Sequence, residues 1–177
     1  MQAVPNVVRE HWPEYLMEAA GLGLFMISAA VVTTLLEYPH SPLHGLFADQ
    51  AIRRLMIGLA MGATAIGLIY SPWGKRSGAH LNPAVTLTFY RLGKIGGIDA
   101  CSYVMAQFFG GALGLWLVSR AIGKAVEHPA VNYVVTTPGP AGSGTAFVAE
   151  ALISFGLMLV VLMVSNTTSL NAWTGCV

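Results

Sequence analysis

The sequence predicts an all-α membrane protein with four transmembrane helices and one re-entrant half-helix. Of its 177 residues, 55% are hydrophobic and only 10% are charged, whereas soluble domains carry about 25% charged residues. Four apolar segments are long enough to cross the hydrocarbon core of a bilayer, which takes about 20 helical residues. Between the second and third of them, a polar, turn-forming stretch leads into a fifth apolar segment that is too short to span. This short segment predicts a helix that enters the membrane and stops inside it.

The four predicted spans contain few charges, and each charge indicates a specific environment. Glu18 is the one charge within the first span, and Glu150 lies near the start of the fourth. Arg53 and Arg54 open the second span, where we expect both side chains to reach back to the membrane surface. The spans are predicted at residues 15–36, 51–70, 99–122 and 145–167.

The connection between the second and third spans holds the most informative motif. Asn82-Pro83 is a strong helix-start signal, because asparagine is a preferred N-cap and proline fits the first helical turn. The apolar residues that follow predict a half-helix over about residues 83–91. Irregular backbone at membrane depth survives only inside protein or along a wet cavity. This loop therefore indicates a pathway through the membrane.

The residues around this helix start supply hydrogen-bond acceptors and a donor. We expect the backbone carbonyls of Gly78, Ala79 and His80 to line the pathway, while the His80 ring braces the loop. The side-chain amide of Asn82 can point into the same space as a donor. The N-terminus of the half-helix adds about half a positive charge, which repels cations. A row of acceptors that leads to a donor suits water or a small alcohol.

Two acids near the membrane interior admit two interpretations. An intramembrane carboxylate is costly and is normally paired or hydrogen-bonded. Glu18 and Glu150 can accept backbone N–H groups from re-entrant loops and hold those loops in place, with Gln107 of the third span as a neutral partner. The two acids can alternatively act as a proton relay, as in pumps. No chain of further acids or histidines connects them, which favours the structural role.

Small residues and a faint internal repeat indicate how the helices pack. Small residues at four-residue spacing let helix backbones approach closely in lipid. The dipeptide Glu18-Ala19 recurs as Glu150-Ala151 after three spans, so a second unit would enter the membrane from the opposite side, as in the inverted repeats of many transport proteins. The small residues on the second and third spans are Gly58, Gly62, Ala106, Gly110 and Gly114.

The stretch from Ser77 to Thr86 resembles the first Asn-Pro-Ala loop of the aquaporin and glycerol-facilitator family, also called the major intrinsic proteins. Its motif residues are Asn82, Pro83 and Ala84. The resemblance extends over residues 14–167.

Three further residues match that family's pattern at the expected places in the spans. Glu18 and Glu150 resemble the acids that hold the family's two re-entrant loops, and Gln107 follows Ala106 as in the family.

The resemblance implies six spans and two half-helices that meet at the membrane centre, assembled as a homotetramer with one pore per subunit. It implies a multi-pass protein of the plasma or inner membrane. By match, Asn82 is the first of two pore asparagines. One filter residue comes from the second span and is Met61, or Gly62 if the following loop lacks one extra residue. By the same resemblance, Gly78, Ala79 and His80 supply the row of backbone carbonyls that lines the pore.

The domain organisation follows from the same resemblance. We expect a single aquaporin-like transmembrane domain over residues 1–177, with a first repeat at 14–122 and the start of a second at 145–177. The family's second Asn-Pro-Ala, its filter arginine and its last two spans have no counterpart in this sequence. We therefore expect an incomplete domain, part of a longer channel, that does not conduct alone.

The sequence thus predicts a passive channel for water and small neutral solutes such as glycerol, which excludes ions and protons. We expect no catalytic residues, no metal site and no cofactor. A net charge of +1 without a basic tail argues against nucleic acid as a partner. Two alternatives stay open: a proton-coupled carrier of small solutes that uses Glu18 and Glu150, and a half-size channel that works as an antiparallel dimer.

Overall fold

The computed structural model describes residues 4–169, and all regular structure in that range is helical. Four of the helices are long and apolar enough to cross a membrane, which confirms the predicted all-α membrane class. The chain divides into two compact units, Met1–Val134 and Val135–Val177, and each is described by itself. Residues 170–177 of the predicted second repeat lie outside the described residues.

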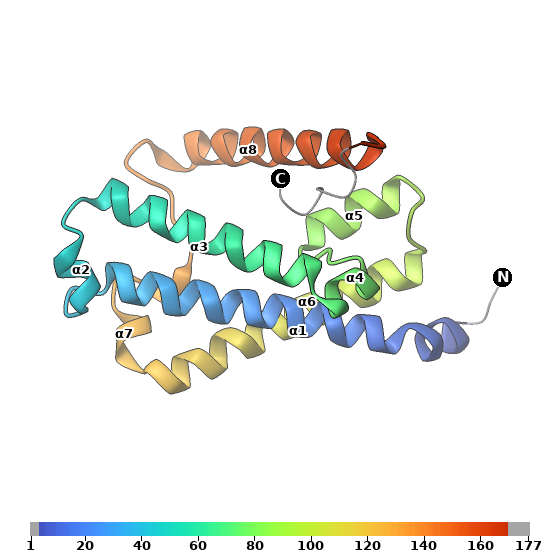
Figure 1. Cartoon of the computed structure of the whole chain (residues 1–177), viewed down its shortest axis with the longest axis horizontal. Coiled ribbons are helices and arrows are strands. Elements are labelled where there is room, and N and C mark those ends of the chain that lie inside the picture. The colour runs from blue at the N-terminus through green and yellow to red at the C-terminus, as the bar shows by residue number, and fades with distance from the viewer. Residues whose placement is uncertain (1–3, 170–177) are drawn as a thin grey trace. The chain divides into compact units, whose positions relative to one another are not determined.

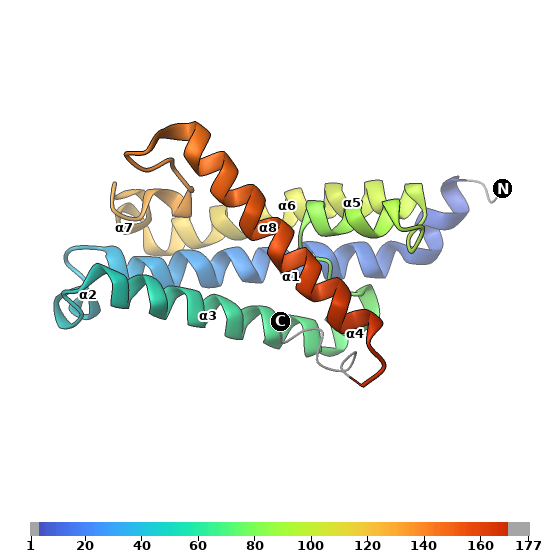
Figure 2. The same ribbon diagram turned by 90° about the horizontal axis from the view of Figure 1, so that it is seen from above.

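The first unit is a bundle in which α1 is the central helix. Figure 2 shows α1 between α3 and α6, and α5 lies beside α6 in both ribbon views (Figures 1 and 2). The helix predicted at 83–91 is present as α5. The elements are α1 (Val4–Glu37), α2 (Pro42–Leu46), α3 (Gln50–Tyr70), α4 (Pro72–Ser77), α5 (Pro83–Arg91), α6 (Gly97–Ile122), α7 (Lys124–Glu127) and the 3₁₀ turn η1 (Asn132–Val134).

Helix α1 begins well before the predicted span, at Val4 rather than near residue 15. Its added N-terminal turns are not isolated, because they are joined to the first turn of α6. In these turns His11 Nδ1 lies 2.8 Å from Asp99 Oδ1, and Tyr15, at the start of the predicted span, donates its hydroxyl to the same oxygen at 2.6 Å. These long-range bonds stabilise helix beyond the apolar segment from which the span was predicted.

The most extensive packing in the unit joins α1 to α6 through small residues, as the four-residue spacing predicts. A Cβ built at Gly110 would overlap the carbonyl oxygen of Ala19, and one built at Gly114 would overlap that of Gly23. Any side chain at either position would push the helices apart. Glycine is therefore required here by backbone contact, which lets two membrane helices gain dispersion energy at short range.

Helix α3 packs on α1 less closely. The hydroxyls of Ser28 and Thr64 share a hydrogen bond of 2.8 Å between the two helices. A Cβ at Gly58 or Gly62 would meet no atom within 4 Å among the described residues, so the predicted close-packing face on α3 is not used inside this unit.

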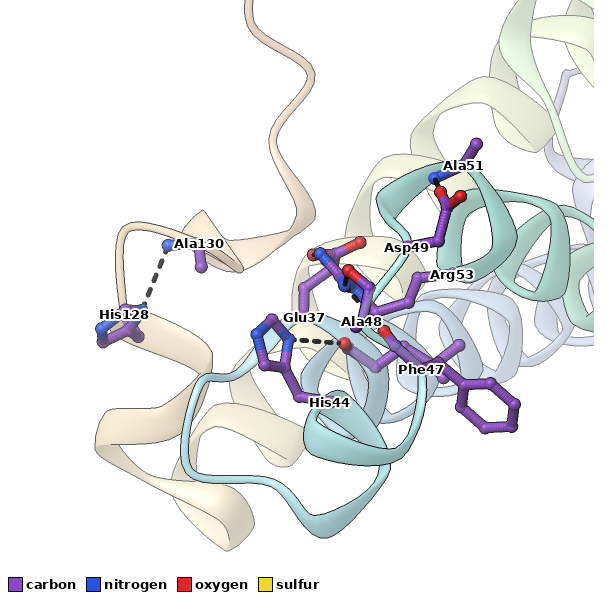
Figure 3. Close-up of polar contacts among 10 residues, drawn as sticks. Glu37, His44, Phe47, Ala48, Asp49, Ala51, Arg53, His128 and Ala130 are labelled. Atoms are coloured by element: carbon purple, nitrogen blue, oxygen red, sulfur yellow. Dashed lines mark hydrogen bonds and ion pairs between the residues drawn. The ribbon is translucent and has the colours of Figure 1, made fainter.

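The loop between α1 and α3 is closed by a buried arginine, and the expected exposure of Arg53 is wrong. Its guanidinium lies 3.2 Å from Glu37 and donates to the carbonyls of Phe47 and Ala48 at 2.8 and 2.9 Å (Figure 3). The side chain of Arg53 is only 8% exposed. Burial wins over reaching the surface because Glu37 and two carbonyls together satisfy the planar guanidinium. The next residue, Arg54, is exposed as predicted.

The second unit contains α8 (Gly142–Asn166), which matches the fourth predicted span within three residues at its start and one at its end. None of its described residues is buried. An apolar helix of this length needs lipid or other helices around it.

Candidate functional site

The loop between α4 and α5 has an unusual backbone. Gly78, Ala79 and Leu81 all have positive φ, at 89°, 46° and 47°. Glycine adopts this left-handed region freely, but each non-glycine residue there costs about 1–2 kcal/mol. Such a conformation persists only where the surroundings fix it. The residues that fix it define the candidate site.

The carboxylate of Glu18 is the principal group that holds this loop. Glu18 lies on α1 and is fully buried, with 0% of its surface exposed. Its Oε1 accepts the hydroxyl of Ser77 at 2.7 Å and the backbone N–H of His80 at 3.0 Å. Its Oε2 accepts the N–H of Leu81 at 2.8 Å and the side-chain amide of Gln107 at 2.8 Å. Four donors on one carboxylate offset the cost of burying its charge.

The direction of these N–H groups also sets the direction of the loop carbonyls. The N–H of Ala79 donates to Ser77 Oγ at 3.1 Å, so three successive N–H groups, of residues 79–81, face the Glu18 side. In a trans peptide unit the C=O points opposite to the N–H, and every described peptide bond is trans. The carbonyls of Gly78, Ala79 and His80 therefore face away from Glu18. Within the described residues, no hydrogen bond uses these three oxygens.

Asn82 begins α5 as predicted. Its Oδ1 accepts the N–H of Ala84 at 2.8 Å, in an extended N-cap conformation with Pro83 in the first turn. The cap uses the acceptor end of the amide, so the Nδ2 donor has no partner among the described residues. The Asn82 side chain is exposed in this unit. The helix start thus presents one free amide donor beside the row of free carbonyls.

Two side chains that sequence analysis did not single out, Thr86 and Tyr103, complete the site. Thr86 on α5 is fully buried and accepts the Gln107 amide at 3.0 Å, and its hydroxyl lies 3.1 Å from His80 Nδ1. The hydroxyl of Tyr103 donates to the carbonyl of Ser77 at 2.7 Å. Tyr103 stands four residues before Gln107 on α6, so helical spacing alone would have placed both on one buried face.

The His80 ring packs inside the loop. It stacks on Phe89 with ring centroids 5.0 Å apart and meets the edge of Tyr103 at 5.2 Å. Together with the contact to Thr86, these neighbours fix the ring in one position. The imidazole of His80 therefore packs against α5, the helix that follows the loop. This position fits the expectation that the ring supports the loop from inside.

A polar cavity of about 530 Å³ opens beside the loop and is lined in part by Gly78 and His80. Its rim carries charges of both signs. Arg76 Nε donates to Glu14 at 2.8 Å, and Asp99 joins α6 to α1 as described above. Lys75 and Lys94 also line it. This hollow thus adjoins the residues at both ends of the carbonyl row.

The two remaining predicted site residues lie on α3 and on α8, which belongs to the second unit. Met61 is half-buried on α3, and its role at a filter position stays a prediction. Glu150 lies on α8 with an exposed side chain. Its role as a second loop-holding acid also stays a prediction. Within the described residues, no group of three or more His, Cys, Asp or Glu side chains could hold a metal ion.

Comparison with known proteins adds independent information. The family model "Major intrinsic protein" matches residues 7–173. The probable aquaporin AqpM of Archaeoglobus fulgidus is 39% identical over 110 residues, which cover 62% of this chain and 44% of that protein. The glycerol uptake facilitator protein-like 6 of Lactiplantibacillus plantarum is 35% identical over 118 residues, 67% of this chain and 54% of that protein.

A plant relative extends the match along nearly the whole chain. Aquaporin NIP2-1 of Oryza sativa is 30% identical over 166 residues, which cover 92% of this chain and 51% of that protein. The chain thus spans about half the length of the curated relatives it matches. With an all-α membrane fold and a family model that covers most of its residues, this chain belongs to the major intrinsic protein family, which includes the aquaporins and glycerol facilitators.

Proposed function

We propose that this chain supplies one half of a passive channel for water and small neutral solutes such as glycerol. The observation that carries the proposal is the opposed arrangement of the loop's peptide groups. The backbone N–H groups of residues 79–81 donate to Ser77 and Glu18, and the carbonyls of residues 78–80 are left free on the other side. A row of fixed acceptors replaces part of a solute's hydration without binding it tightly, which favours passage.

Exclusion of ions follows from the same elements. The free amide donor of Asn82 and the N-terminus of α5 lie at the end of the carbonyl row, and both disfavour a cation. Met61 is proposed to narrow the pathway from α3. We further propose that Glu150 holds a second loop in the complete protein. A re-entrant path for α5, a homotetramer and residence in the plasma or inner membrane belong to the same proposal.

The domain organisation belongs to the proposal as well. We assign residues 14–122 to a first repeat and residues 145–177 to the start of a second repeat. The span of about half the relatives' length supports a pathway completed by further chain.

The test uses vesicles that carry the complete gene product and measures both solute flow and proton current. We expect osmotic swelling in water and glycerol gradients with no current above that of protein-free vesicles. A proton current coupled to solute uptake would instead support the carrier that uses Glu18 and Glu150. Swelling by vesicles that contain only residues 1–177 would support the half-size dimer.

The substitution Asn82→Asp sharpens this test at the helix start. The new carboxylate still caps α5 but replaces the amide donor by a negative charge, so we expect lower water permeability and a measurable potassium flux. Asn6→Asp, at an exposed position near the N-terminus, is the matched control. Undiminished exclusion of potassium by the Asn82→Asp variant would contradict the role assigned to Asn82.

A further inference from the structure

A long apolar groove runs along the outer side of the contact between α1 and α6. It has a volume of about 460 Å³, and none of its lining residues carries a charged side chain. We call it the α1–α6 groove. The glycine contacts bring the two backbones together, so the larger side chains stand on either side of a furrow. Its walls include Leu16, Leu24 and Ile27 from α1, Leu113 and Leu117 from α6, and Trp73 from α4 at one end.

A second hollow continues the groove beyond Trp73. It has a volume of about 320 Å³, shares Leu16, Ala20 and Trp73 with the groove, and adds Trp12. Trp12 and Trp73 are 55% and 54% exposed. Tryptophan is enriched at the level of the lipid headgroups, where its ring meets both apolar and polar surroundings. This end of the groove therefore fits the membrane surface, and the other end fits the hydrocarbon core.

Positive charge lies just beyond Trp12 on α1. Arg9 precedes Trp12 by three residues on α1, on the same helix face, and is exposed. Arg76 also follows Trp73 on α4, but its Nε donates to Glu14 at 2.8 Å and its side chain lines the polar cavity rather than the groove. Guanidinium groups with free donors bind phosphate well.

The length of the groove agrees with the depth of one leaflet. From Trp12 to Ile27 the α1 axis rises about 22 Å at about 1.5 Å per residue. Half of a bilayer, headgroups included, measures about 20–22 Å. We propose that the groove and its tryptophan end form a binding site for one phospholipid, with an acyl chain along the α1–α6 groove and the phosphate at Arg9. This lipid site is independent of the proposed transport activity.

The first experiment uses the full chain in phosphatidylcholine vesicles with a trace of phosphatidylglycerol that carries a diazirine on its acyl chain. After irradiation, we expect adducts to concentrate on Leu24, Ile27 and Leu117. Leu59 on α3 and Phe108 on α6 are more exposed, at 66% each, than Leu24 at 46%. Random lipid contact would label those two more strongly, and that result, or even labelling of all faces, would overturn the proposal.

Two sets of variants separate a bound lipid from general solvation. Ala20→Phe fills the groove and should abolish the concentrated labelling, whereas Ala63→Phe, on an exposed face of α3, should not. Arg9→Gln should lower the number of phospholipids retained on the detergent-purified protein in native mass spectrometry. Lys124→Gln, on α7 at the other end of the unit, is the charge control.

A competing occupant gives a distinct result. If a second copy of the chain covered the groove, Leu24→Cys would form disulfide-linked dimers in vesicles and the photoactivatable lipid would label the groove weakly. These two results together would show that the groove is a contact between two copies of the chain and would overturn the lipid site. Unchanged labelling and lipid retention in all groove and arginine variants would equally reject the site.

Discussion

Two loops of the first unit are each held by one buried charge, and they differ in what the charge consumes. Between α1 and α3, the guanidinium of Arg53 takes the carbonyls of Phe47 and Ala48. Between α4 and α5, the carboxylate of Glu18 takes the N–H groups of His80 and Leu81. The buried guanidinium donates hydrogen bonds and so occupies backbone carbonyls. The buried carboxylate accepts hydrogen bonds and so occupies backbone N–H groups. Among the described residues, the loop held by Glu18 is therefore left with the free carbonyls of Gly78, Ala79 and His80, whereas Arg53 consumes the carbonyls that it holds.

This difference suggests why an acid occurs where a solute pathway is proposed. Either charge stabilises an irregular backbone, because each supplies partners that helix or sheet would otherwise provide. Only an acid does so while it leaves acceptors for a polar neutral solute. The comparison predicts that damage at Glu18 affects both stability and transport, and that damage at Arg53 affects stability alone.

The largest expected effect is that of Glu18→Gln. One amide oxygen replaces two carboxylate oxygens, and the new NH₂ group faces other donors, so at least two of four charge-assisted hydrogen bonds are lost. We expect a loss of stability on the order of 3 kcal/mol or more and water permeability no higher than that of protein-free vesicles. Thermal unfolding in detergent and stopped-flow swelling measure the two quantities.

The matched control for this change is Glu10→Gln, at an exposed position on the same helix. It should alter neither quantity. Normal swelling by the Glu18→Gln variant would show that the loop does not need the carboxylate, and the comparison between the two loops would then fail.

The next effect is that of Arg53→Met, which leaves Glu37 and two carbonyls without their donor. Removal of one partner from a buried ion pair costs about 3–5 kcal/mol. Below its lowered unfolding temperature, we expect the variant to keep full water permeability, because the loop between α4 and α5 is untouched. Arg54→Met, one residue further on and exposed, should unfold as the wild type does. A selective loss of permeability in folded Arg53→Met protein would contradict the separation of roles.

A smaller effect is expected for Tyr103→Phe, which removes one hydrogen bond to the carbonyl of Ser77 and keeps the ring against His80. The loss of stability should be about 1 kcal/mol, with water permeability reduced but measurable. Tyr90→Phe is the control, because Tyr90 is 47% exposed. If Tyr103→Phe matched the control in both assays, α6 would hold the loop through Gln107 alone.

The smallest effect compares two helix caps. Asp49 caps α3 through Ala51 at 2.7 Å, much as Asn82 caps α5 through Ala84 at 2.8 Å. Replacement of either cap by alanine should cost about 1 kcal/mol. Only Asn82→Ala should also change solute permeability, since only Asn82 offers a free amide donor beside the carbonyl row. Equal permeability in the two alanine variants would limit Asn82 to a capping role.

Much of this fold follows from local sequence. Hydropathy located the four long helices, and Asn82-Pro83 located the start of α5, because apolar run length and capping are properties of neighbouring residues. The spacing of Gly110 and Gly114 likewise indicated a close helix contact before any partner was known. The row of free carbonyls could be stated only as an expectation, since it depends on where three N–H groups find acceptors.

The pairing of buried polar groups was decided by the tertiary structure. The bonds of Glu18 to the loop and to α6 join residues 59 to 89 positions apart, and no periodicity reports contacts at that distance. The same holds for Arg53, whose sequence context indicated a surface position although Glu37 and the loop carbonyls bury it. Composition determines how much charge must be satisfied inside a membrane protein, but only packing determines which groups satisfy it.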